Sequence, residues 1–421
     1  MPTRYPTLRQ NGNDRYRPPT WKRSVPFWGV PLTTTAEPAT RVPFRVAVLA
    51  LGTFAVGTDA FVVAGVLPEI STDLGVGIAQ AGQLVTVFAI AYAVLSPILA
   101  TLTGTWSRRA VLLTALAVFV LGNIATALAP SYAAVLATRV IAAAGASMFT
   151  PIAGAAAASL APESQRARAI SLVVLGLTVS TALGVPLGTL LGSVTSWRGT
   201  MWFVAALGAA AGVGVALLLP TIPAPPAAGL RERLAPLRNG KITAILLTTV
   251  AFFIGIFIVN TYISVIVKPA TGDDGALLAV LLFLSGVAGT VGNLVSGGWT
   301  DRFGARRVIA VAMVLALVNC LLMPITAETM VGAVPAVLLF GLTAWSVTVP
   351  QQHRLIEAAP SATSLVISLN ASGGYLGSSL AGVIGAAALE VSPTALPLVA
   401  AVFIVIGLAA SELAQRIGAR S

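Results

Sequence analysis

The chain has 421 residues, of which 57% are hydrophobic and only 9% charged, and its formal net charge is +11. Soluble domains carry about 25% charged residues, so the composition excludes a soluble globular protein, a secreted domain and a receptor with a large soluble head. The single cysteine, Cys320, and single histidine, His353, exclude a disulfide framework, a cysteine or histidine metal cluster and a histidine-dependent catalytic triad. The only Gly-Lys pair, Gly240-Lys241, precedes Ile242, so the phosphate-binding loop of an ATPase is absent. We expect no metal, no cofactor and no enzymatic activity.

Residues 1–43 are polar and rich in Arg, Pro and Thr, which predicts a flexible tail that is not cleaved as a signal peptide. Twelve apolar runs follow, each long enough for a membrane-spanning helix of about 20 residues. The predicted spans are 44–66, 79–102, 110–129, 133–160, 169–193, 200–220, 242–267, 276–298, 307–326, 331–353, 363–388 and 393–412. Their length favours helices over the ~10-residue alternating strands of a membrane β-barrel. The predicted fold class is therefore an all-α membrane protein with twelve transmembrane helices.

Lysines and arginines fall almost entirely on one side of these spans. With the N-terminus placed inside, 22 of the 25 lie in inner segments, and only Arg198 and Lys268 lie in outer loops. Because cytoplasmic loops carry an excess of Lys and Arg, we expect both termini in the cytoplasm of a multi-pass protein of the cell inner (plasma) membrane. The positive charge then reflects topology and contact with the lipid bilayer, and we expect no nucleic-acid partner.

The two halves of the chain resemble parallel repeats. Ser147-Met-Phe-Thr-Pro151 resembles Ser346-Val-Thr-Val-Pro350, 199 residues later in the sequence. The predicted organisation has five parts: a flexible cytoplasmic tail (1–43), an N-terminal six-helix bundle (44–220), a cytoplasmic linker (221–241), a C-terminal six-helix bundle (242–412) and a cytoplasmic tail (413–421). Two bundles in one orientation are typical of a transporter whose site lies at the midplane between them.

Only two ionisable residues lie well inside the predicted spans, Asp59 in the first and Arg139 in the fourth. Such a charge costs about 2.5–3.5 kcal/mol on insertion scales, so it usually has a function. Both lie at a similar depth, roughly 10–16 Å below the outer surface at 1.5 Å per residue, so they can touch. Either the carboxylate gains and loses a proton beside a tuning guanidinium, or a static ion pair locks the two helices. We predict the proton-coupling role, because a transporter needs a titratable group.

Polar and aromatic side chains in spans 7 and 10 are candidate substrate ligands. Trp345 offers a stacking face, and the amides of Gln351 and Gln352 offer donors and acceptors for a planar polar ligand. Asn260 and Tyr262 lie in span 7, which occupies an equivalent place in the repeat. The alternative interpretation assigns Trp345 to helix packing, the Gln pair to the inner interface and the others to contacts between helices.

Two glycine-bearing segments are candidates for gating and helix packing. Span 5 contains Gly184, Pro186 and Gly188, which either only allow close helix packing or also form a hinge and seal between the bundles. The predicted inner loop after span 8 holds an acid beside clustered arginines. Its residues are Gly297, Asp301, Arg302, Gly304, Arg306 and Arg307. Such a group can hold two helices together by charge-assisted hydrogen bonds. The alternative is that it is only a short, positively charged inner loop.

These segments resemble the major facilitator superfamily in its drug:proton antiporter branch. The loop after span 8 resembles the family's inner gating motif, and Leu183-Gly-Val-Pro186-Leu-Gly188 resembles the span-5 motif of antiporters. Arg139 falls at the family's span-4 arginine, and Gly57-Thr-Asp59 resembles the span-1 signature of the branch. The equivalent first-half loop, Gly104 to Arg109, departs from the motif because it lacks the acid and the second glycine. Ala81 to Tyr92 and Trp345 to Gln352 resemble bacterial purine and nucleoside efflux pumps, and also sugar and chloramphenicol exporters.

The resulting functional prediction is proton-coupled efflux of small organic molecules, purine-like compounds or drugs, by alternating access. Its partners would be a small-molecule substrate and protons, and the chain would act as a monomer. The alternative is an importer or facilitator of a small polar metabolite such as a sugar. A membrane enzyme is the third hypothesis, and it would need paired acids or metal ligands that the spans lack.

Overall fold

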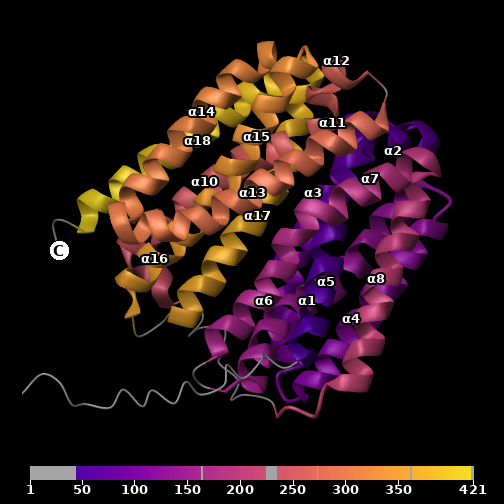
Figure 1. Ribbon diagram of the computed structural model, residues 1–421, viewed down its shortest axis with the longest axis vertical. Helices are drawn as coiled ribbons and strands as arrows, with labels where there is room; N and C mark the ends of the chain where they lie inside the picture. The colour runs from indigo at the N-terminus through magenta and orange to yellow at the C-terminus, as the bar shows by residue number, and fades with distance from the viewer. Residues whose placement is uncertain (1–43, 163–164, 224–234, 273, 361–362, 419–421) are drawn as a thin grey trace, which may run out of the picture. The chain divides into compact units, whose positions relative to one another are not determined.

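The computed structural model describes residues 44–162, 165–223, 235–272, 274–360 and 363–418 (Figure 1). In this part of the chain twelve helices are long and apolar enough to cross a membrane, which confirms the predicted fold class. The predicted tail at 1–43 and most of the predicted linker lie outside the described residues, as does the end of the predicted C-terminal tail.

The first six spans form the N-terminal bundle. Their elements are α1 (Phe44–Val62), η1 (Val63–Gly65), α2 (Leu67–Leu74), α3 (Ile78–Leu102), α4 (Arg108–Leu128), α5 (Tyr132–Leu160), α6 (Arg166–Val179), the π-helical turn η3 (Ser180–Gly184), α7 (Val185–Val194) and α8 (Trp197–Leu218). The elements α6, η3 and α7 together make one span.

The last six spans form the C-terminal bundle. Their elements are η4 (Ala235–Arg238), α10 (Gly240–Thr261), α11 (Ile263–Ile266), α12 (Lys268–Thr271), α13 (Gly275–Phe303), α14 (Ala305–Thr326), α15 (Met330–Ser346), α16 (Thr348–Ala358), α17 (Thr363–Val391) and α18 (Ala395–Gly418). The elements α15 and α16 share the tenth span.

The two bundles repeat one pattern of helix contacts. In the N-terminal bundle, α1 packs on α6 and α8, and α4 packs on α5 and α8. In the C-terminal bundle, α10 correspondingly packs on α17 and α18, and α14 packs on α15 and α18. Between the bundles, α3 packs on α17 and α13 packs on α7. Each bundle therefore contributes two helices to the interface, so a site between the two bundles contains residues from both halves of the chain.

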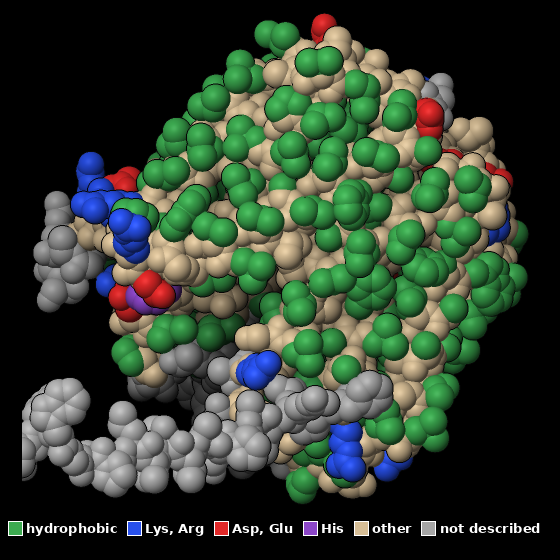
Figure 2. All heavy atoms as spheres, viewed as in Figure 1, with side chains coloured by type: hydrophobic (Ala, Val, Ile, Leu, Met, Phe, Trp, Pro, Cys, Tyr) green, Lys and Arg blue, Asp and Glu red, His purple; other side chains and the backbone are tan. Residues whose placement is uncertain are grey.

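Small residues let the helices within a bundle approach closely. A Cβ atom on Gly122 of α4 would lie 2.5 Å from the backbone nitrogen of Ala142 in α5, and one on Gly145 would lie 2.4 Å from that of Phe119. Close backbone approach through small residues is the usual way in which helices associate within lipid. The outer faces carry large exposed hydrophobic side chains, and Figure 2 shows them across the middle of one face, with charged side chains at its edges.

The charged residues divide the helix ends into two groups. We call the end that bears Arg108, Arg168 and Arg302 the arginine-rich end, and the end that bears Glu69 and Asp274 the acidic end. The elements α2, α11 and α12 lie at the acidic end, at the top of Figure 1.

Contacts between the bundles gather in the half nearer the acidic end. Gln83 of α3 donates to the carbonyl of Gly382 in α17 at 3.2 Å. A Cβ on Gly286 of α13 would lie 2.2 Å from the carbonyl oxygen of Thr181. At the opposite, lower end of the view, the surface is hollowed (Figure 2). Among the described residues, these contacts therefore join the bundles in the half nearer the acidic end, while the hollow lies toward the arginine-rich end.

Four predicted helix ends differ from the structure by five residues or more. The seventh span is shorter than predicted, and α13, α16 and α18 continue to Phe303, Ala358 and Gly418, beyond the predicted ends at 298, 353 and 412. Two of these differences have a local reason. The seventh span ends at Thr261 rather than 267, because Tyr262 leaves the helical conformation (φ −107°, ψ 21°) before two short helices. The segment after 298, predicted as a loop, is helical as far as Phe303, and Gly304 ends it with a φ of +82°. A positive φ favours glycine, because a Cβ clashes there.

Candidate functional site

The predicted pair of intramembrane charges forms an ion pair. The Nη1 atom of Arg139 lies 2.6 Å from Oδ1 of Asp59, and Nη2 donates to the backbone carbonyl of Asp59 at 3.3 Å. Both side chains are buried, at 0% and 1% exposed. Oδ2 of Asp59 and Nε of Arg139 are also buried, and neither has a hydrogen-bond partner. One oxygen of the carboxylate is thus bound to the guanidinium, and the other is buried without a hydrogen bond.

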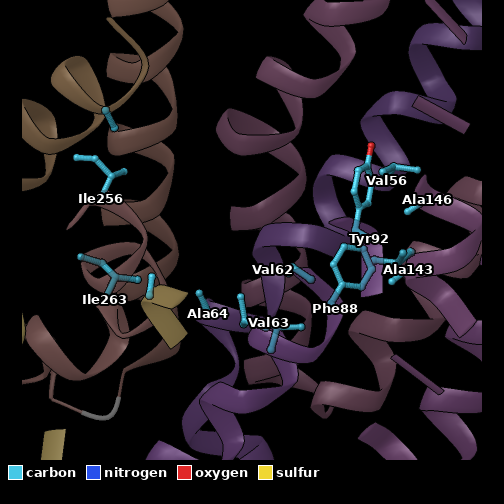
Figure 3. Close-up of a cluster of buried hydrophobic side chains, with 14 of the residues drawn as sticks. Val56, Val62, Val63, Ala64, Phe88, Tyr92, Ala143, Ala146, Ile256 and Ile263 are labelled. Atoms are coloured by element: carbon cyan, nitrogen blue, oxygen red, sulfur yellow. The ribbon is translucent and has the colours of Figure 1, made fainter. Parts of the chain in front are cut away.

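Phe88 of α3 covers this ion pair. Its ring centroid lies 4.4 Å from Cζ of Arg139, which is a cation–π geometry. Figure 3 shows the rings of Phe88 and Tyr92 beside Ala143 and Ala146 of α5, whose small side chains leave room for them. Phe88 also lines a cavity between the two bundles. One side chain therefore lies between the charges and that cavity.

This cavity, which we call the central cavity, has a volume of about 120 Å³ and a largely aromatic lining. Its aromatic residues are Phe61, Phe88, Phe253, Phe257, Trp345 and Tyr375. The ring of Phe61 stacks on Phe257 at 5.9 Å and meets Trp345 edge-on at 6.0 Å, so these contacts join the two bundles. Offset or edge-to-face aromatic arrangements of this kind suit a flat, weakly polar ligand.

Trp345 and Asn260 lie together at a smaller neighbouring cavity. Its volume is about 50 Å³, and it shares Phe61 and Trp345 with the central cavity. Asn260 and Ser285 line it and supply an amide and a hydroxyl. The predicted candidates Trp345 and Asn260 are therefore placed where both can reach a ligand between the bundles.

Gln351 lies in a buried polar network of the C-terminal bundle. Its Nε2 donates to the carbonyl of Ile245 at 3.0 Å and to Oγ1 of Thr249 at 2.9 Å, and its Oε1 accepts from Arg354 at 3.2 Å. Thr249 in turn donates to Oδ1 of Asn370 at 2.7 Å. The amide that was predicted to bind substrate is thus occupied by helix contacts in this conformation.

Gln352 and Tyr262 lie apart from the central cavity's lining. Gln352 is half-buried on α16. Tyr262 is fully buried and donates its hydroxyl to the carbonyl of Gly382 at 3.1 Å. A Cβ on Gly82 of α3 would lie 2.4 Å from that hydroxyl oxygen, so Tyr262 packs where the bundles meet. Tyr262 thus contacts both α3 and α17.

The glycines of span 5 face α1. The π-helical turn η3 ends at Gly184, two residues before Pro186, and such turns frequently occur at functional sites. A Cβ on Gly184 would lie 2.0 Å from Oγ1 of Thr58, and one on Gly188 would lie 2.5 Å from Val62. Span 5 therefore packs tightly along α1 beside Asp59.

The motif after span 8 is arranged differently from the predicted latch. Arg306 forms its ion pair with Glu412 of α18 at 2.6 Å, whereas Asp301 and Arg307 are exposed. The guanidinium of Arg302 lies over the ring of Phe303 at 5.2 Å. The remaining member, Gly297, is half-buried. The acid that pairs with the arginine cluster is thus one that the sequence interpretation did not select.

Sequence reasoning missed most of the aromatic lining. The phenylalanines Phe61, Phe88, Phe253 and Phe257 carry no polar group that would distinguish a side chain in a cavity from one that faces lipid. The weak available signal is the accumulation of phenylalanines in span 7. Among the described residues, no group of three or more His, Cys, Asp or Glu side chains could hold a metal ion.

Comparison with protein families and curated proteins agrees with this arrangement. Residues 49–382 match the family model described as Major Facilitator Superfamily. The chain is 31% identical over 329 residues to the uncharacterized MFS-type transporter YbcL of Bacillus subtilis, covering 78% of this chain and 84% of that protein. It is 30% identical to the inner membrane transport protein YdhP of Escherichia coli (83% and 90% covered). It is also 32% identical to a chloramphenicol resistance protein of Streptomyces lividans (86% and 89% covered).

Two solved structures share the fold. A bacterial homologue of the human lysosomal transporter Spinster, in an inward-facing and unoccupied conformation, aligns with a TM-score of 0.69 at 17% identity, covering 89% of this chain and 97% of that one. The nucleoside transporter NupG aligns with a TM-score of 0.73 at 13% identity, covering 88% and 99%. The relatives are transporters rather than enzymes. With the twelve apolar helices, they identify a multi-pass protein of the inner membrane.

Proposed function

The chain belongs to the Major Facilitator Superfamily of small-molecule transporters, and from this premise we propose that it is a proton-coupled exporter working by alternating access. Substrate would leave the cell as protons enter, and a single chain would suffice because both bundles that form the central cavity come from it. The buried ion pair of Asp59 and Arg139 supports this proposal most directly.

Asp59 is proposed as the proton carrier. Its Oδ2 is buried without a hydrogen-bond donor, and its Oδ1 is held by Arg139. Protonation would weaken the attraction to the guanidinium and free α1 from α5, whereas deprotonation would restore the pair. Exchange transport requires a contact between helices that forms or breaks with the binding of a proton, and this ion pair would be such a contact.

The substrate class is proposed from the lining of the central cavity. Six aromatic side chains surround a volume of about 120 Å³, while Asn260 and Ser285 lie at the adjoining small cavity. This combination favours a flat aromatic molecule with a few polar edges, such as a purine-like compound or a planar drug. A sugar has hydroxyl groups around its ring, and the central cavity offers few partners for them.

The direction of transport is proposed from charge. The arginine-rich end would face the cytoplasm by the positive-inside rule, so the conformation described here would be open to the cytoplasm. In that conformation the exporter would load its substrate from inside the cell.

Transport by the purified protein in proteoliposomes tests the proposal. An imposed pH gradient should drive movement of radiolabelled adenine or chloramphenicol, and Asp59→Asn should abolish that drive while the variant still inserts. Glu390→Gln, which changes an exposed acid at the end of α17, is the matched control and should behave as wild type. Downhill movement of glucose that is insensitive to an uncoupler would instead establish the facilitator alternative.

A further inference from the structure

A second apolar cavity lies on the other side of α15, outside the transport site. Its volume is about 360 Å³, and it lies among α13, α14 and α15. The walls include Trp299 and Phe303 of α13 and Val311 and Leu315 of α14, all at least 40% exposed. We call it the lateral crevice. Because it opens among lipid-facing side chains, its natural occupant comes from the membrane.

The floor of the lateral crevice presents no free polar group. Thr343 and Ser346 of α15 lie there, but their hydroxyls donate to the carbonyls of Leu339 and Leu342 in their own helix, at 2.8 and 2.5 Å. Trp345, between them in sequence, lines the central cavity. The helix α15 therefore separates the two cavities, and the lateral crevice offers only apolar contact in its depth.

The mouth of the lateral crevice carries uncompensated positive charge. Arg307 lines it at the arginine-rich end and, among the described residues, makes no hydrogen bond or ion pair. Arg302 lies over Phe303, also without an ion pair in the described part of the chain, whereas Arg306 is neutralised by Glu412. Asp301 is the one acid between them, so the mouth keeps a net positive charge. An exposed arginine beside an apolar slot offers a charge-assisted bond to an anion that carries a hydrocarbon chain.

We propose that the lateral crevice binds one anionic phospholipid, with an acyl chain between α13 and α14 and its phosphate on Arg307. Arg302 would add a second positive charge, and Trp299 and Phe303 would lie at the level of the glycerol backbone. Basic pockets between membrane helices bind anionic headgroups for this electrostatic reason. The lipid would bridge α13 and α14, which the structure joins covalently only through the turn at Gly304.

Native mass spectrometry of the full-length protein, titrated with dioleoyl phosphatidylglycerol or dioleoyl phosphatidylcholine, tests this proposal. We expect one tightly retained phosphatidylglycerol and weaker retention of phosphatidylcholine. Arg307→Gln should weaken phosphatidylglycerol binding about fivefold, because one arginine contributes about 1 kcal/mol to the attraction for an anionic headgroup. Arg168→Gln, which changes an exposed arginine at the same end on α6, should leave it unchanged.

A filling variant tests the acyl-chain part of the proposal. Val311→Trp adds bulk to a wall residue that is 57% exposed and therefore tolerant of change, and it should reduce retention of phosphatidylglycerol. Equal retention of the two lipids, or equal effects of Arg307→Gln and Arg168→Gln, would overturn the proposal. Unchanged binding to Val311→Trp, or equally tight binding of soluble glycerol phosphate, would overturn the role of the crevice.

Discussion

Phe88 lies over Arg139, with its ring centroid 4.4 Å from the guanidinium carbon, and the same phenylalanine lines the central cavity. The charged pair and the place proposed for substrate are therefore neighbours separated by one side chain. In the proposed mechanism, substrate and proton would influence each other through the position of that ring.

Removing the Phe88 ring should expose the ion pair to water from the central cavity. Phe88→Ala is expected to raise the proton flux without substrate, measured with a pH-sensitive dye in proteoliposomes under a pH gradient. It should also cost about 3–5 kcal/mol of stability, as large-to-small changes in cores do. Phe257→Ala widens the same cavity without uncovering Arg139 and is the control. An equal proton flux in the two variants would show that Phe88 does not shield the pair.

The stability of the ion pair should depend on both partners together. Asp59→Asn leaves a buried guanidinium without its counter-charge, so it should lower the free energy of unfolding by about 3–5 kcal/mol. Adding Arg139→Gln should recover most of that loss, because the double variant buries no net charge. Thermal unfolding in detergent measures both effects. A double variant that regains stability but not coupling separates the proton role from a purely structural one, and a double variant that keeps coupling refutes the proton role.

The close approach of Gly286 to the carbonyl of Thr181 should control closure of the acidic end. Gly286→Ala places a Cβ 2.2 Å from a backbone oxygen that cannot rotate away, so α13 and the π-helical turn η3 must separate. We expect the population closed at the acidic end to fall, which spin-label distances across that end would record. Gly298→Ala lies in the same helix with nothing within 4 Å and should not change those distances. Identical distance distributions for the two variants would contradict this role.

Glu69 should make stability fall as the pH rises. Burial raises the pKa of Glu69 above its ordinary 4.5, so the folded protein holds this proton more tightly than the unfolded chain. Its contribution to stability is therefore complete below pH 4.5 and is lost as the pH rises through the folded-state pKa. Glu69→Gln should flatten the melting temperature across that window.

Asp73, on the same helix as Glu69, should make stability change with pH in the opposite direction. Hydrogen bonds from Trp197 and Arg198 lower the pKa of Asp73 below its ordinary 3.8. The stability from Asp73 is therefore present above pH 3.8 and lost as the pH falls through the folded-state pKa. Asp73→Asn should remove that acid-side loss while leaving the Glu69 effect in place, and the same slope in both variants would contradict these assignments.

Hydropathy and the distribution of arginine predict the fold because the bilayer penalises exposed polar backbone and charge so strongly. Asp59 and Arg139 could be paired from sequence for the same reason, since they are the only charges well inside the predicted spans. The central cavity could not be predicted, because the sequence does not show whether a phenylalanine in a membrane helix faces lipid or a cavity. Gln351 shows the converse: its amide suits a ligand, yet Thr249 and Ile245 lie close enough to use it. Which partner an amide chooses depends on tertiary packing.

The two halves fasten their arginine-rich ends by different chemistry. In the N-terminal bundle Arg108 donates to the carbonyl of Ala155 at 2.6 Å and Arg109 to that of Ala216 at 2.7 Å, whereas in the C-terminal bundle Arg306 relies on the exposed carboxylate of Glu412. Dissolved ions screen an exposed ion pair far more than a bond to a peptide oxygen. Ionic strength therefore acts unevenly on this symmetrical architecture: concentrated salt weakens the contact that Arg306 makes between α14 and α18 before it weakens the contacts of Arg108 and Arg109.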